Sequence, residues 1–261
     1  YVSLHRYVGN RDDDTPDYLA ITNSIDQQIE EMDAVCRFVQ ARSRSKKRHY
    51  LCFDEWNVWY RAREGHHVNG QGRFAPHLLE EEYNLEDALV VAEFLNSFIR
   101  HADVVKIANI AQIVNVIAPI ATRGDEMLLQ TIYYPFVMYS QRREGTAIQP
   151  VVLGPGYESP SYGEVKTIDT SAILGDGVLH VFMVNRSLTE SAPVIIQHPG
   201  GRLIGVRSAQ IVNGNHPDQH NTYTQPSVIT NKPFTGILVQ DGEGQLKLPP
   251  LSVAAVTFEV E

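Results

Sequence analysis

The residues best suited to chemistry lie in one short segment, Phe53-Asp54-Glu55-Trp56-Asn57-Val58-Trp59-Tyr60. The apolar stretch Tyr50–Phe53 predicts a buried strand, and the carboxylate of Glu55 follows where that strand ends. Aromatic rings beside a carboxylate suit a sugar, because their faces cover its C–H surfaces while the acid reaches the anomeric carbon. The alternative is a structural acid bonded to nearby backbone, with both tryptophans in the core. The segment alone leaves these two interpretations evenly balanced.

A second candidate pair is His5 and Tyr7 in the strand-like opening segment Tyr1–Tyr7. Strand alternation puts both side chains on one face, opposite Leu4. From there the pair could orient a neighbouring carboxylate by hydrogen bonding. Taken in isolation, however, a hydrogen-bonded core histidine is the favoured interpretation.

Two amides, Gln112 and Asn115, interrupt the apolar run Val104–Val116, which is typical of a strand buried on both faces. A buried amide is costly unless it is hydrogen-bonded. Gln112 lies near the predicted strand end, where it could hold a sugar hydroxyl. The open alternative is a hydrogen bond to a neighbouring strand.

Helices are predicted between and after these strands, over about residues 17–40, 85–101 and 125–143. Asn84 is the expected N-cap of the second helix with Asp87 as its box partner, and Pro135 is expected to kink the third helix. Strands and helices on this rhythm indicate βα units of a parallel sheet. Only three units are present, whereas a closed (β/α)8 barrel needs eight.

The amino-acid composition changes between Gly145 and Pro150. The residues before this point are rich in charge, and those after it are poor in charge and rich in glycine and proline. We therefore predict two domains, 1–145 and 146–261, the second an antiparallel β-sandwich. Its strand candidates are Leu179–Val184, Pro193–Gln197, Ala209–Val212, Gly236–Gln240 and Val253–Val260.

Composition excludes several classes of protein. The net charge of -9 argues against a nucleic-acid partner, and the basic run Arg42–Arg48 is better explained as a solvated helix end. No apolar run is long enough to cross a bilayer, so no membrane role is expected. Cys36 and Cys52 cannot build a disulfide framework. His66 and His67 lack further ligands at metal-binding spacing, and the chain has no phosphate-binding loop, so we expect no metal and no cofactor.

These clusters together resemble the α-L-arabinofuranosidases of glycoside hydrolase family 51. The resemblance rests on four segments: Ser3-Leu4-His5-Arg6-Tyr7, the block from Phe53 to Tyr60, Ala111-Gln112-Ile113-Val114-Asn115, and Leu248-Pro249-Pro250-Leu251-Ser252-Val253. Their order and separations match the last three barrel strands and the C-terminal sandwich of that family. The implied fold is α/β plus all-β: strands six to eight of a (β/α)8 TIM barrel, followed by a jelly-roll-like antiparallel β-sandwich.

The resemblance also implies roles for single residues. Glu55 would be the nucleophile of a retaining mechanism. His5 and Tyr7 would support it and line the sugar pocket. Trp59 would form a pocket wall, and Gln112 would bind arabinose hydroxyls.

One part of the family pattern is absent. The general acid/base of the family is a glutamate that follows an asparagine, and no Asn-Glu dipeptide occurs in this sequence. Retention needs two carboxyl groups about 5–5.5 Å apart, and this chain offers one convincing candidate. We therefore expect an N-terminal barrel segment, as a second chain or as missing sequence, without which the fragment would be inactive and unstable.

The leading hypothesis is the C-terminal portion of an exo-acting α-L-arabinofuranosidase that acts on arabinoxylan, arabinan and their oligosaccharides. The resemblance implies a cytoplasmic homo-oligomer, with secretion left open because the chain starts at Tyr1. One alternative is a related retaining glycosidase acting on xylosides or glucans. Another is a non-catalytic carbohydrate-binding or assembly fragment dominated by the sandwich.

Overall fold

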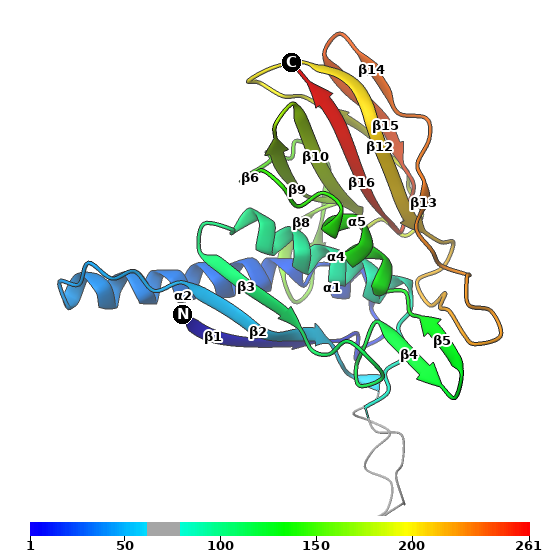
Figure 1. Ribbon diagram of the computed structural model, residues 1–261, viewed down its shortest axis with the longest axis horizontal. Helices are drawn as coiled ribbons and strands as arrows, with labels where there is room; N and C mark the ends of the chain where they lie inside the picture. Colours follow the sequence, from blue (N-terminus) through cyan, green and yellow to red (C-terminus); the bar gives the residue numbers. More distant parts are fainter. Residues whose placement is uncertain (62–78) are drawn as a thin grey trace, which may run out of the picture.

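The first part of the chain forms a three-stranded parallel sheet with helices on one face (Figure 1). A computed structural model describes residues 1–61 and 79–261. The strands lie in the order β1-β2-β3 and comprise β1 (Val2–Val8), β2 (Leu51–Val58) and β3 (Val105–Ile110). Helices α1 (Thr15–Leu19), α2 (Thr22–Arg42) and α4 (Leu85–Arg100) belong to this part. The predicted βα rhythm is confirmed.

The first predicted helix is in fact two helices, α1 and α2. Asp14 caps α1 by accepting a hydrogen bond from the Asp17 backbone N–H at 3.0 Å. After Leu19, the backbone N–H groups of Ala20 and Ile21 bond three residues back, at 3.1 and 3.2 Å. These tighter turns interrupt the α-helical ladder, which explains why a continuous apolar periodicity gives two elements.

Helix α4 begins as predicted. Asn84 Oδ1 accepts from the Asp87 backbone N–H at 3.1 Å, and Asp87 Oδ2 accepts from the Asn84 backbone N–H at 3.0 Å, which completes a capping box. Nearly every side chain of α4 is buried, including Glu93. The helix lies between the parallel sheet and the second part of the chain (Figure 1).

The third helix was predicted wrongly over its first half. The chain instead forms the hairpin β4 (Ile120–Arg123) and β5 (Glu126–Leu129), followed by the shorter helix α5 (Tyr133–Ser140). Gly124 adopts a φ of 58°, which permits the tight hairpin turn. Pro135 lies in the first turn of α5, where a proline removes no helical hydrogen bond, so the expected kink has no cause.

The apolar run Val104–Val116 was also predicted too long and too buried. Strand β3 ends at Ile110, and the chain then turns into a loop. Residues 106–109 are exposed, because β3 is an edge strand and no described residue covers the face of the sheet opposite the helices. An apolar sequence on an open face indicates a surface that another segment can cover.

Two antiparallel sheets form the second part of the chain. The larger sheet contains β6 (Thr146–Ile148), β9 (Ile168–Gly175), β10 (Val178–Asn185), β12 (Leu203–Asn213), β13 (Lys232–Pro233) and β16 (Ser252–Val260). The smaller sheet contains β11 (Ala192–Ile196), β14 (Leu238–Gln240) and β15 (Glu243–Leu248). A separate hairpin joins β7 (Gly156–Ser159) to β8 (Gly163–Lys166). All five strand candidates correspond to observed strands; the sequence did not indicate β6, β7, β8, β9, β13 and β15.

The larger sheet is covered on both faces. On one face Phe182 stacks on Tyr139 of α5 with ring centroids 4.1 Å apart, within a core that reaches back to Trp56. On the other face Met183 and Leu248 belong to a second core shared with the smaller sheet. Burial from both sides explains why β10 is apolar at consecutive positions rather than alternating. The predicted change from a parallel α/β segment to antiparallel sheets is confirmed.

Buried charges connect the two parts of the chain. Arg186, which follows β10, donates to Glu93 of α4 at 2.7 Å and lies 3.4 Å from Asp169 of β9. Arg100 of α4 bridges Asp169 and Asp26 of α2, at 2.9 and 2.8 Å. These polar groups are removed from water, so each depends on its partners for compensation.

Burial raises the pKa of Glu93 from its ordinary value of 4.5 to about 8. The folded protein therefore keeps this proton longer than the unfolded chain does. Protonated Glu93 therefore stabilises the folded state fully below about pH 4.5, and this stabilisation is lost as pH rises through about 8. We expect Glu93→Gln, which cannot titrate, to gain stability relative to the native protein as pH rises from about 5 to 9.

Thermal unfolding of both proteins across this pH range checks the prediction. Glu158→Gln is the matched control, because Glu158 is exposed on β7. The difference in unfolding temperature between Glu158→Gln and the native protein should stay constant. A constant difference for Glu93→Gln as well would contradict the raised pKa.

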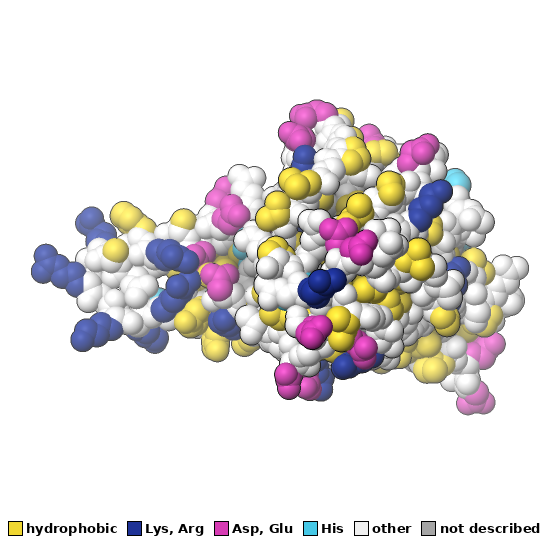
Figure 2. Space-filling view, turned by 90° about the horizontal axis from the view of Figure 1, so that it is seen from above, with side chains coloured by type: hydrophobic (Ala, Val, Ile, Leu, Met, Phe, Trp, Pro, Cys, Tyr) yellow, Lys and Arg dark blue, Asp and Glu magenta, His cyan; other side chains and the backbone are white. Residues whose placement is uncertain are grey.

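The basic run Arg42–Arg48 lies at the exposed end of α2, where dark-blue side chains gather at the narrow end of the molecule (Figure 2). This placement agrees with a solvated helix end. No helix among the described residues is long and apolar enough to cross a membrane.

Candidate active site

A β-bulge places Glu55 on the open face of the parallel sheet. Leu4 pairs with Phe53 but His5 pairs with Glu55, so Asp54 is an extra residue without a partner in β1. Strict alternation would point Glu55 the same way as Phe53, into the helices. Instead Phe53 and Trp56 both pack on the Phe98 ring of α4, at centroid distances of 5.0 and 5.2 Å. Glu55 therefore faces away from the helices, and its side chain is 47% exposed.

His5 and Tyr7 of β1 reach the same oxygen of Glu55. The Tyr7 hydroxyl donates to Glu55 Oε2 at 2.9 Å, and His5 Nδ1 lies 3.4 Å from that atom. Leu4 is buried on the helix side, so the predicted division of the β1 faces is confirmed. The histidine is 51% exposed rather than a core residue.

The two tryptophans of the motif have different surroundings. Trp56 is fully buried, and its ring packs on Phe94 and Phe136 as well as Phe98. This tryptophan belongs to the core, as the structural alternative held. Trp59 follows β2, and its ring meets the Tyr7 ring edge-on at 5.3 Å. Trp59 therefore stands beside the group that contacts Glu55.

Gln112 lies in the loop after β3 rather than in a long strand. Its side chain is exposed, and its backbone N–H donates to the Ile117 carbonyl at 3.2 Å. The buried amide of Asn57 donates to the Ala111 and Ile117 carbonyls, at 2.8 and 2.6 Å, and fixes both ends of this loop. Gln112 follows the strand next to β2, but none of the hydrogen bonds found within the described residues joins it to Glu55.

Sequence reasoning missed two residues of the site, Ser3 and Asp54. The Ser3 hydroxyl lies 2.8 and 2.9 Å from the two carboxylate oxygens of Asp54, and His5 Nε2 lies 3.4 Å from Asp54 Oδ1. Asp54 adjoins Glu55 in the motif, which was the available signal. Regular alternation would put Asp54 and Glu55 on opposite faces of β2. The bulge breaks this alternation, and Asp54 therefore contacts Ser3 and His5 beside Glu55.

The environment of Asp54 makes it a poor proton donor. The hydrogen bond from Ser3, aided by the nearby charge of His5, lowers the pKa of the Asp54 carboxyl below its ordinary value of 3.8. A general acid at neutral pH needs a raised pKa instead. Asp54 is therefore unsuited to the acid/base role of a retaining glycosidase.

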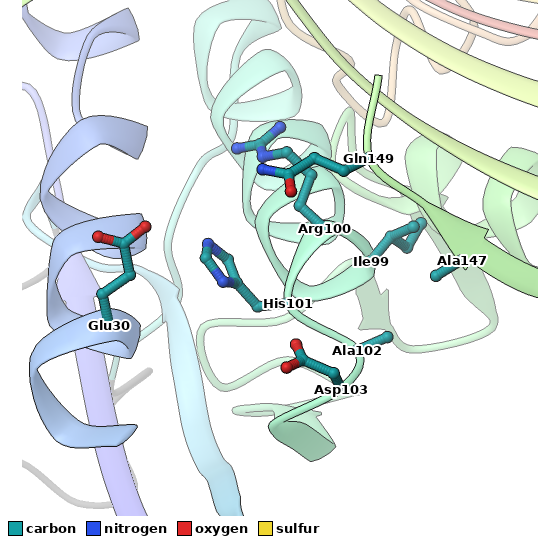
Figure 3. A pocket seen from close by; sticks show the side chains of 8 residues that line it. All are labelled: Glu30, Ile99, Arg100, His101, Ala102, Asp103, Ala147 and Gln149. Carbon is teal, nitrogen blue, oxygen red and sulfur yellow. The ribbon is translucent and has the colours of Figure 1, made fainter. Parts of the chain in front are cut away.

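A hollow of about 380 Å³ lies away from these residues, between α2, the end of α4 and β6 (Figure 3). His101 to Asp103, which line it, come just before β3, so the hollow is at the opposite end of the strand from Gln112. None of the predicted site residues lines it. Residues 1–61 and 79–261 hold no group of three or more histidine, cysteine or acidic side chains that could bind a metal ion, and His66 and His67 fall outside the described residues.

Comparison with known proteins identifies the family of the chain. Residues 54–252 match the family described as the alpha-L-arabinofuranosidase C-terminal domain. An intracellular exo-α-(1→5)-L-arabinofuranosidase of Acetivibrio thermocellus is 41% identical over 202 residues, which are 75% of this chain and 40% of that protein. An exo-α-(1→6)-L-arabinofuranosidase of Bifidobacterium longum is 35% identical over 271 residues, with 98% of this chain and 52% of that protein covered.

Solved structures agree with the sequence matches. A family 51 α-L-arabinofuranosidase from Bifidobacterium longum superposes with a TM-score of 0.90 at 28% identity, over 99% of this chain and 52% of that one. The family 51 arabinofuranosidase from Xanthomonas axonopodis pv. citri gives a TM-score of 0.83 at 27% identity, over 98% and 52%.

Fold and sequence together place the chain among the glycoside hydrolases. More narrowly, it belongs to the α-L-arabinofuranosidases of glycoside hydrolase family 51 and corresponds to their C-terminal portion. It spans 38% to 52% of the length of the curated relatives described as exo-acting arabinofuranosidases from Streptomyces lividans and Bifidobacterium longum.

Proposed function

We propose that this chain supplies the nucleophile of a retaining, exo-acting α-L-arabinofuranosidase, and that the nucleophile is Glu55. The observation that carries the proposal is the convergence of Tyr7 and His5 on Glu55 Oε2, on the open face of a parallel sheet. A carboxylate of β2 that accepts a hydrogen bond from a tyrosine and lies 3.4 Å from a histidine nitrogen suits attack on an anomeric carbon.

In this proposal Glu55 attacks the anomeric carbon and forms a glycosyl ester, while the leaving oxygen takes a proton from a general acid. Water, deprotonated by the same group, then cleaves the ester with net retention. Tyr7 and His5 hold the carboxylate. Trp59 forms a wall of the pocket, and Gln112 binds hydroxyls of the sugar. The mechanism uses no metal and no organic cofactor.

The general acid/base would come from an upstream segment, by which we mean residues that precede Tyr1 in a longer polypeptide or belong to a second chain. Two features support this partner. The sheet face that carries Glu55 is open, with Ile107 of β3 exposed on this edge strand. The chain also spans only about half the length of its structural relatives. An added segment that closed the sheet into a barrel would bury this face.

The substrates we propose are terminal α-L-arabinofuranosyl units of arabinan, arabinoxylan and their oligosaccharides. Relatives are named for activity on α-(1→5) and α-(1→6) linkages, which supports the sugar and leaves the linkage open. Several relatives are named intracellular, which supports a cytoplasmic enzyme. We further propose a homo-oligomer, from the family alone.

Hydrolysis of aryl glycosides tests this function. We expect the chain together with its upstream segment to hydrolyse an aryl α-L-arabinofuranoside with retention, and an aryl β-D-xyloside roughly 100-fold more slowly. The chain alone should bring about neither reaction. Preference for the xyloside would favour the related-glycosidase alternative. Sugar binding that survives deletion of residues 1–145, without any hydrolysis by the assembled protein, would favour the carbohydrate-binding alternative.

A further inference from the structure

A line of polar contacts runs along the open face of the sheet, from Ser3 to Asp54 to His5 to Glu55. Ser3 bonds the Asp54 carboxylate at 2.8 and 2.9 Å, and the two ring nitrogens of His5 each lie 3.4 Å from a carboxylate. Nε2 faces Asp54 Oδ1 and Nδ1 faces Glu55 Oε2. The imidazole therefore bridges the two adjacent acids of the bulge.

We propose that Asp54, held by Ser3, is a positioning residue that fixes the imidazole of His5 against Glu55. This inference rests on the proposed function, in which Glu55 is the nucleophile. It gives Asp54 no contact with the sugar. Its effect passes entirely through the histidine.

The physical need for such a residue follows from the exposure of His5. A side chain that is 51% exposed can rotate in solvent unless a second contact holds it. An acceptor at Nε2 fixes the ring angle, as carboxylates do for functional histidines elsewhere, and the ring donates to both carboxylates when each nitrogen carries a proton. The bulge supplies this acceptor, because it puts Asp54 within reach of His5 beside Glu55.

A fixed imidazole would also select the attacking oxygen. Tyr7 and His5 both contact Glu55 Oε2, and among the described residues none donates to Oε1. Oε1 is thereby left to form the bond to carbon. Loss of Asp54 should let the imidazole turn away from Oε2, which misplaces the carboxylate without removing any group that touches the sugar.

The first test is spectroscopic and needs no catalytic activity. In protein labelled with ¹⁵N-histidine, Asp54→Asn should move the Nδ1 and Nε2 resonances of His5, which are assigned by their loss in His5→Gln. Ser3→Ala should move them in the same direction by less. Asp176→Asn, at an exposed position in the β9–β10 turn, is the matched control and should leave them in place.

The second test is kinetic and uses the chain with its upstream segment and an aryl α-L-arabinofuranoside. We expect Asp54→Asn to lower kcat roughly 10- to 100-fold with KM within about twofold of the native value. Asp54→Glu should restore part of the rate. If Asp54→Asn fails to fold, Ser3→Ala, which keeps the carboxylate, should still lower kcat with KM unchanged.

The outcomes separate the two proposals. A native kcat in Asp54→Asn, or His5 resonances that do not move in it, overturns the positioning role while Glu55 can still be the nucleophile. Retention of activity in Glu55→Gln instead overturns the proposed function. In that case the His5 resonances still decide whether Asp54 holds the imidazole.

Discussion

Replacement of Glu55 by alanine should abolish hydrolysis of an aryl α-L-arabinofuranoside, with a fall in kcat of about 10⁴-fold or more. The reason is that the proposed mechanism has no path to the glycosyl ester without this carboxylate. The alanine also leaves a space beside the anomeric carbon. Added azide should therefore restore part of the rate and yield a glycosyl azide of inverted configuration.

The matched control is Glu126→Ala. Glu126 is exposed on β5, where it pairs with Arg123 at 2.8 Å. This variant should keep the native kcat. Activity within about tenfold of the native value in Glu55→Ala would rule out Glu55 as the nucleophile. Rescue without inversion would also contradict the role, because an external anion would then not occupy the position of the carboxylate.

Replacement of Arg186 by methionine should lower the free energy of unfolding by about 3–5 kcal/mol. Besides Glu93, Arg186 donates to the Thr22 hydroxyl and to the backbone carbonyls of Leu19 and Lys166, each of the latter at 2.8 Å. Methionine fills much of the same volume but satisfies none of these acceptors. The loss thus comes from buried polar groups left unpaired rather than from a cavity.

Urea unfolding followed by tryptophan fluorescence measures this effect, because Trp56 is buried in the shared core. Arg207→Met is the control: Arg207 is mostly exposed and pairs with Glu259 at 3.3 Å. Its effect should stay below about 1 kcal/mol. Equal destabilisation by the two substitutions would mean that the buried charges do not join the two parts of the chain.

The sequence was sufficient to bring the central residues of the site together. Alternation put His5 and Tyr7 on one face of β1, and the end of the apolar run at Phe53 marked Glu55. The predicted strand was too short, because β2 continues to Val58. Parallel βα order made the two strands neighbours, so contact between these side chains followed. The bulge could not be foreseen, because a period-two count from Phe53 points Glu55 into the helices. A bulge depends on how two strands pair, and the sequence of one strand does not specify this register.

The elements that the sequence missed share a physical cause. Strand β9 contains Asp169 and Ser171, which look like loop residues, but both are buried where they bond Arg100 and Asn96 of α4. Strand β5 was mistaken for the start of a helix because acidic residues precede its apolar ones, without a strong turn signal beyond Gly124. In each case tertiary contacts override the local pattern.

The most direct test of the role of Glu55 is to trap the covalent intermediate. The assembled enzyme would be treated with an activated 2-deoxy-2-fluoro-arabinofuranoside, whose fluorine slows hydrolysis of the glycosyl ester. Intact mass spectrometry should then show one added fluoro-sugar, and peptide mapping should place it on Glu55. An adduct on any other carboxylate, or turnover of substrate with no adduct formed, would contradict the account.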